Sequence, residues 1–185
     1  MEANGTAPPT ADSSPSSWEH RFVEGVIRRC GQDKGLAAKL RRADNPAMEY
    51  QSWELLASFG VDLEWENQRL PFVTVASAIA KSKAERDGKL TLGQAIARCY
   101  EDGKESNQAK ARLRRLLACN DLPEVCRILR STLSLIDSKV ARPLNFTRLL
   151  KELRLFPFDD KRVKAQWAQD FYSHSAHADS EEAPS

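Results

Sequence analysis

Hydrophobic residues recur at intervals of three and four positions along most of this chain, which is the spacing of one buried face of an α-helix. Trp18, Phe22, Val26 and Cys30 begin the pattern, each four positions after the last. Helices are predicted over about 18–31, 34–43, 47–59, 71–87, 91–100, 107–119, 122–138, 143–156 and 160–174. No segment has the pattern of a strand, and 61–70 has the weakest pattern. We therefore predict an all-α protein, a compact bundle of about eight or nine helices in two packed sub-bundles with no sheet.

Proline, glycine and capping residues mark the predicted helix ends. Pro46, after an Asp-Asn pair, ends one helix and begins the next, because proline fits the first turn of a helix but not its interior. Gly60 and Gly88 follow two predicted helices as C-terminal caps. Thr91 and Gln94 have the spacing of a capping box that opens another helix.

Composition suggests four segments along the chain. Residues 1–17 are rich in Pro, Ser, Thr, Ala and Gly and are predicted to form a disordered tail, and 173–185 are predicted to form a second, acidic one. Between them, a loop at 102–106 separates an N-terminal helical half, 18–103, from a C-terminal helical half, 104–172, that carries a basic surface. Whether the two halves are separate domains or one packed body stays open.

Composition also limits the class of protein. The 185 residues are 41% hydrophobic, enough for a core, and no apolar run is longer than 72–80, so no membrane partner is expected. The start of the chain does not resemble a secretory signal. The four cysteines form no C-x-x-C pair, and their positions in the helical pattern indicate buried free thiols in a reducing compartment. A cytoplasmic protein is predicted.

Charge is distributed unevenly, although the net charge is only +2. Residues 104–154 hold twelve cations and five anions, an excess of seven positive charges, so the rest of the chain carries −5. In three successive predicted helices the leucines share one face and the cations lie on the opposite face or its flanks. Such a surface suits backbone phosphates, and arginine outnumbers lysine there eight to four, which favours bidentate phosphate contacts.

A solvated face that merely uses good helix formers explains one such helix equally well, and that alternative stays open. Four further cations close helices near residues 41 and 81, where the helix dipole favours positive charge. The candidate nucleic-acid-binding residues are Arg41, Arg42, Lys81, Lys83, Lys110, Arg112, Arg114, Arg115, Arg127, Arg130, Arg142, Arg148 and Lys151.

Motifs of enzymatic chemistry are missing from the sequence. There is no phosphate-binding glycine loop, no G-x-S-x-G, no H-E-x-x-H and no histidine with ligand spacing, so we predict no catalytic residue, no metal and no cofactor. A third alternative is an enzyme whose site is assembled from residues dispersed along the chain. Trp18, Trp53, Trp65 and Trp167 mostly occupy inward helical positions, which disfavours a base-stacking platform and leaves phosphate contacts as the expected mode.

Several segments together carry a family resemblance. They are LRRADNP at 40–46, LTLGQAIARC at 90–99, KARLRRLLACNDLPEVCRILRSTL at 110–133, PLNFTRLLKELRLF at 143–156 and WAQDFY at 167–172. In order and spacing, from about residue 18 to 172, the chain resembles the small subunit of Cascade, the type I-E CRISPR interference complex, a family called CasB.

The resemblance implies a non-enzymatic subunit that acts in antiviral defence. In that family two copies pair, alongside the backbone and large subunits of the complex, and a basic surface holds the DNA strand that is displaced when guide RNA pairs with its target. Single-stranded or R-loop DNA is therefore the expected partner, with guide RNA as a further candidate. Motif matches carry this role to Arg41, Arg42, Arg112, Arg114, Arg115, Arg127 and Arg130, and more loosely to Lys81, Lys83, Arg142 and Arg148. The alternative is a helical adaptor that docks its basic face on an acidic protein.

Overall fold

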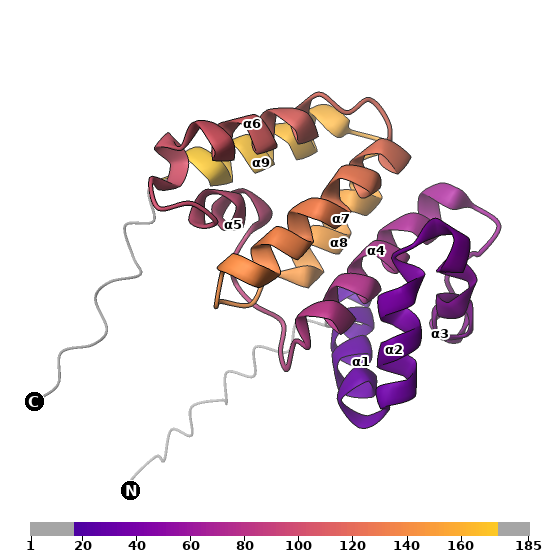
Figure 1. Ribbon diagram of the computed structural model, residues 1–185. Helices are drawn as coiled ribbons and strands as arrows, with labels where there is room; N and C mark the ends of the chain where they lie inside the picture. The colour runs from indigo at the N-terminus through magenta and orange to yellow at the C-terminus, as the bar shows by residue number, and fades with distance from the viewer. Residues whose placement is uncertain (1–16, 174–185) are drawn as a thin grey trace, which may run out of the picture.

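A computed structural model describes residues 17–173, and within that range the regular structure is helical (Figure 1). The elements are α1 (Trp18–Gln32), α2 (Lys34–Ala43), η1 (Pro46–Ser52), α3 (Trp53–Ser58), α4 (Glu66–Ser82), α5 (Leu92–Arg98), η2 (Gly103–Glu105), α6 (Asn107–Leu117), α7 (Leu122–Lys139), α8 (Phe146–Leu155) and α9 (Asp160–Tyr172), where η marks a 3₁₀ helix. Over the described residues there is no strand, and the prediction of an all-α fold is confirmed. The predicted tails lie outside the described residues, except for Ser17 and Ser173, which flank α1 and α9.

Local capping explains where most helices begin. Seven helices, counting η1, start after a side chain that accepts a hydrogen bond from a backbone N–H of the first turn. These caps are Ser17, Asp33, Asn45, Ser106, Asp121, Asn145 and Asp159. At α5 the predicted capping box is present, and the Gln94 Oε1 atom accepts from the Thr91 N–H at 3.3 Å.

Two helix predictions were wrong in their bounds. The helix predicted over 71–87 is α4, which starts five residues earlier and holds Pro71 inside it. It ends at Ser82 because Lys83 adopts a left-handed conformation with φ +51°, which stops the helix well before Gly88. The helix predicted over 47–59 is divided into η1 and α3.

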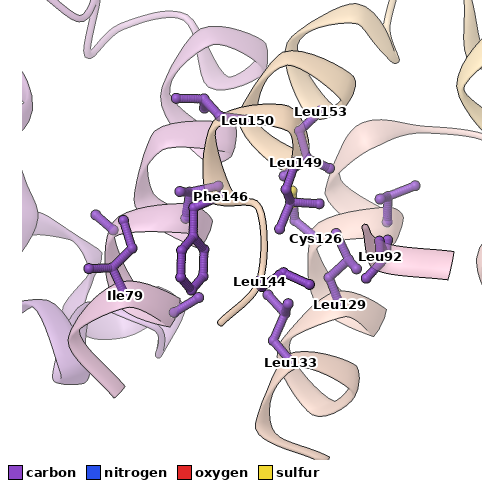
Figure 2. Close-up of a cluster of buried hydrophobic side chains, with 14 of the residues drawn as sticks. Ile79, Leu92, Cys126, Leu129, Leu133, Leu144, Phe146, Leu149, Leu150 and Leu153 are labelled. Atoms are coloured by element: carbon purple, nitrogen blue, oxygen red, sulfur yellow. The ribbon is translucent and has the colours of Figure 1, made fainter. Parts of the chain in front are cut away.

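Helix α4 lies at the centre of the molecule. Every residue from Leu70 to Ala80 is buried, as expected for a helix that is covered on all sides. It packs against α1 and α2 on one side and against α7 and α8 on the other, and Figure 1 shows it between these two groups. Figure 2 shows Phe146, at the start of α8, between Ile79 of α4 and the leucines Leu129 and Leu133 of α7.

Helix α5 packs on α9 and α6, although it belongs by position in the sequence to the predicted N-terminal half. The boundary near residue 103 stays a prediction. A Cβ atom added at Gly93 of α5 would lie 2.4 Å from the Trp167 carbonyl oxygen and 2.6 Å from the Phe171 nitrogen, so α5 and α9 approach closely at this glycine.

Hydrogen bonds join the loop that follows α4 to the loop that follows α7. The Asp87 carboxylate accepts from the backbone N–H groups of Phe146 at 2.7 Å and Thr147 at 3.3 Å. The Gly88 N–H donates to the Leu144 carbonyl at 2.9 Å, next to a single parallel bridge between Leu90 and Leu144. These bonds hold segment 83–91 against segment 140–146, and both segments carry cations.

Candidate nucleic-acid interface

Predicted cations from three helices meet around Asp44, the residue that ends α2. The Lys81 ammonium of α4 forms a hydrogen-bonded ion pair with the Asp44 carboxylate. The Arg130 Nε atom of α7 lies 3.7 Å from the other oxygen of the same carboxylate. Arg41 of α2 donates to the Ala80 carbonyl, one residue before Lys81, at 3.3 Å. One carboxylate thus holds two cations from distant parts of the sequence side by side.

A hollow of about 500 Å³ opens next to this cluster, between α4, α7 and segment 140–146. Four of its lining residues are cationic, namely Lys81, Arg86, Arg130 and Arg142, and three are acidic, namely Asp44, Glu85 and Asp137. Its deeper walls are apolar and largely buried. The structure therefore joins three predicted site residues, from α4, α7 and the segment after α7, at one rim.

Helix α6 and the start of α7 carry a second group of predicted residues. Arg114 and Arg115 are exposed, and neither forms an ion pair within residues 17–173. The Arg127 side chain is 66% exposed, with its guanidinium 3.7 Å from Glu124. Solvent screens so loose a contact, and all three arginines can therefore bind an anionic partner.

Two other cations of α6 have partners inside the chain. The Arg112 Nε atom donates to the Tyr100 hydroxyl at 3.4 Å. The Lys110 ammonium lies 3.0 Å from the Glu105 carboxylate and lowers the pKa of that exposed carboxyl, chiefly through the hydrogen bond. These contacts are weak because solvent reaches the Glu105 carboxylate and the Arg112 bond is long.

Arg148 of α8 has strong contacts inside the protein. Its guanidinium donates to Glu152 at 2.8 Å and to Asp170 at 2.6 Å, and Glu152 also accepts from the Trp167 Nε1–H at 2.7 Å. Burial raises the pKa of the Glu152 carboxyl, while the hydrogen bonds from Trp167 and Arg148 oppose the rise. The network gives Arg148 a structural role in joining α8 to α9.

Charge compensation reduces the basic excess of α8 further. The Arg154 guanidinium pairs with Glu19 of α1 and lies 4.9 Å from the centre of the Trp18 ring. Lys151, one of the predicted residues, is exposed without an ion pair in the described part of the chain. Of the three basic helices, α6 and α7 pack against each other, whereas α8 packs mainly against α4, α1 and α9.

The remaining predicted residues lie near the first cluster in sequence. Arg42 is exposed and donates from Nε to the Gln51 side chain at 2.9 Å. Lys83 is exposed at the end of α4. Arg86 also lines the hollow but was not among the predicted residues, because only the folded structure brings it next to α7 and segment 140–146. Its signal in the sequence was the concentration of four cations at 81, 83, 86 and 89.

The tryptophans correct one expectation. Trp167 is fully buried and Trp18 is partly buried, but Trp53 is 41% and Trp65 64% exposed. Trp65 lies outward because it precedes α4 as its N-cap, outside the helical pattern. Both tryptophans belong to segment 43–68, which contains six acidic residues and no Lys or Arg. Its charge is therefore unfavourable for stacking the bases of a phosphate-bearing strand.

The side chains of residues 17–173 also determine metal binding, membrane crossing and the reactivity of the cysteines. No group of three or more His, Cys, Asp or Glu side chains could hold a metal ion there, and no helix in that range is long and apolar enough to cross a membrane. All four cysteines are free thiols, and burial raises the pKa of each. The value for Cys126 rises to about 11.

The fold and the basic groups define an all-helical protein with exposed cations on several helices. Residues 36–172 match the family described as CRISPR-associated protein Cse2 (CRISPR_cse2). The chain belongs to this family, which confirms the resemblance to the CasB small subunits. A comparison with curated proteins found no significant match.

Solved structures share the fold. CasB from M. ruber is 24% identical, with a TM-score of 0.67 over 84% of this chain and 93% of that one. A Cse2-family protein from Thermus thermophilus is 23% identical, with a TM-score of 0.66 over 83% and 97%. A chain of a structure described as a CRISPR RNA-guided surveillance complex is 21% identical, with a TM-score of 0.61 over 83% and 90%.

Proposed function

We propose that this chain is a non-catalytic small subunit of a CRISPR RNA-guided surveillance complex of the Cascade type. Its task there is to bind the DNA strand displaced in the R-loop and so stabilise the R-loop during antiviral defence. Membership of the Cse2 family and the shared fold with a chain of a surveillance complex support the assembly. The observation that carries the DNA-binding part is the set of exposed cations on α6, on α7 and around the hollow beside Asp44.

Phosphate contacts suit this task physically. A displaced strand has a different sequence at every target, so its holder must bind the backbone and leave sequence recognition to the pairing of guide and target. The exchange of a DNA duplex for an RNA–DNA heteroduplex is nearly balanced in free energy. A few phosphate contacts, which add up through release of counterions, are therefore enough to favour the open state.

In this proposal the predicted residues contribute unequally to the binding of DNA. Among the predicted residues, the exposed cations whose side chains form neither an ion pair nor a hydrogen bond in the described part of the chain contribute most, and these are Lys83, Arg114, Arg115, Arg142 and Lys151. Lys81 and Arg130 present their charges at fixed places, because the Asp44 carboxylate holds both side chains. The same carboxylate neutralises part of their positive charge. Arg148 contributes least, since two carboxylates already occupy its guanidinium.

The proposed partners follow from the same assembly. They are the backbone and large subunits of the complex, a second copy of this chain, and single-stranded or R-loop DNA, with guide RNA as a further candidate. The compartment for this function is the cytoplasm.

The test is binding of single-stranded DNA to the full chain as a function of salt. Each phosphate contact adds about 0.7 to the slope of log affinity against log salt concentration. We expect the double variant Arg114→Glu/Arg115→Glu to lose affinity and about 1.4 units of slope, corresponding to two contacts.

The matched control is Arg28→Glu/Lys34→Glu, which changes the net charge equally at exposed residues of α1 and α2. It should leave the slope unchanged. An affinity that stays constant between roughly 50 and 200 mM salt would exclude phosphate contact. Saturable binding to an acidic protein together with no binding to DNA would instead establish the adaptor alternative.

A further inference from the structure

The hollow between α4, α7 and segment 140–146 has the size and walls of a ligand site. Its volume of about 500 Å³ falls in the range of small-molecule pockets. Ala78 of α4, Leu133 and Ile136 of α7, and Leu144 and Phe146 line it with apolar surface, each no more than 9% exposed. Figure 2 shows Leu133, Leu144 and Phe146 in the same cluster. A flat, weakly polar group would be desolvated favourably between such walls.

Thr74, one of the residues that line the same hollow, has a buried hydroxyl without a proper partner. Thr74 is 3% exposed, and its Oγ1 atom has no hydrogen-bond partner of normal geometry. The hydroxyl interacts with the Cys126 thiol, where it opposes the rise in pKa caused by burial, but a thiol is a weak hydrogen-bonding group. A buried hydroxyl left in this condition costs free energy, and a rotation of Thr74 about χ1 that turned the hydroxyl towards the hollow would let a ligand with a donor or acceptor on its edge satisfy it.

The rim carries charge at two fixed places. Lys81 and Arg130 are held together by Asp44, and Arg142 follows α7 in a segment tied to Leu90 and Gly88 by backbone hydrogen bonds. Arg86 lies in the partner segment and also lines the hollow, together with the acidic residues Glu85 and Asp137, so the cations that line it outnumber the acids four to three. Cations on both sides of an apolar hollow can bind two successive phosphates while the group between them enters it.

From these features we infer that the hollow binds one nucleobase, turned out of a single strand whose flanking phosphates lie on the rim cations. This inference rests on the proposed function and adds a base-sized subsite to it. The base faces contact the apolar walls, and an edge of the base meets the Thr74 hydroxyl. An apolar side chain from a protein partner fits less well, because it would leave Thr74 unsatisfied and would have no use for the rim cations.

The experiment compares two probes on the full chain. One is a single-stranded DNA oligonucleotide of mixed sequence, and the other is the same length of sugar-phosphate backbone without bases. Both carry the same charge, so a site that reads only phosphates binds them equally. A base that stacks in a protein site gains about 1–3 kcal/mol, which converts to a preference of about 5- to 150-fold for the oligonucleotide.

Substitutions in the hollow test whether the preference for the oligonucleotide over the base-free backbone arises there. Ala78→Leu fills the hollow and should abolish the preference, while Ala165→Leu makes the same change on the exposed face of α9 and should keep it. Thr74→Val removes the hydroxyl at nearly constant shape and should reduce the preference even if Ala78→Leu fails to fold. A fluorescent adenine analogue in the oligonucleotide should brighten on binding to the wild type, because the base leaves its stacked neighbours, and not on binding to Ala78→Leu.

The two proposals fail in different ways. Equal affinity of the wild type for both probes overturns the base subsite and leaves phosphate binding intact. A preference that survives Ala78→Leu places the bases elsewhere and also overturns it. No binding of either probe overturns the proposed function and the subsite together. Binding of a protein partner that Ala78→Leu abolishes, with equal affinity for the two DNA probes, assigns the hollow to a protein side chain.

Discussion

The close approach of α5 and α9 can be tested by adding a single methyl group between the two helices. Gly93→Ala would place a Cβ atom 2.4 Å from the Trp167 carbonyl oxygen and 2.6 Å from the Phe171 nitrogen. Both are backbone atoms of α9, so no change of side-chain rotamer can relieve the clash. Ordinary contact begins at 3.4 Å, and α9 must therefore move by about 1 Å. Phe171 and Trp167 are fully buried in the core, and such a movement disturbs both.

The expected magnitude follows from two opposing effects. Overpacking of a close contact costs about 1–3 kcal/mol. Alanine is better than glycine in a helix by up to about 1 kcal/mol, which offsets part of the cost. We expect a net loss of about 1–2 kcal/mol in the free energy of unfolding, and a fall in Tm of about 2–8 °C for a domain of this size.

Denaturant unfolding measured by circular dichroism checks this value, with Gly31→Ala as control. Gly31 lies near the end of α1 and has nothing within 4 Å of its added Cβ atom. The same substitution there should stabilise the protein by about 0.4–1 kcal/mol, because it restricts the unfolded chain. If Gly93→Ala is as stable as the wild type, or both variants shift in the same direction, the reasoning from backbone contact is refuted.

Three further predictions concern buried groups. Because burial raises the pKa of Glu152 above 4.5, the wild type should lose stability relative to Glu152→Gln as the pH rises from about 4 towards neutrality, and a constant difference would contradict this. The Cys126 thiol, with a pKa of about 11, should alkylate about a thousand times more slowly at pH 8 than a fully ionised thiolate. Rapid labelling of Cys126 in the folded protein would disprove its burial. Gly88→Ala should destabilise the protein and detach segment 83–91, because its Cβ atom would lie 1.9 Å from the Pro143 carbonyl oxygen, and protease resistance of that segment is the measurement.

The sequence predicted elements whose cause is local. The 3.6-residue repeat of apolar positions identified nine helical segments, since each repeat depends on neighbouring residues alone. Thr91 and Gln94 were recognisable as a helix start for the same reason, because the groups of a capping box lie within one turn of each other. The bounds of α4 were wrong because Pro71 is tolerated within a helix buried on all sides, and the left-handed turn at Lys83 has no mark in the sequence.

The sequence thus determined by itself the helical class, the buried face of most helices and the excess of cations after residue 104. Only the tertiary structure decided which cations meet. It brought Lys81 and Arg130 to one carboxylate, enclosed Arg148 between Glu152 and Asp170, and placed a hollow beside the first pair. The physical reason is that periodicity tells which side of a helix leaves water, whereas the group it then meets depends on how distant helices pack.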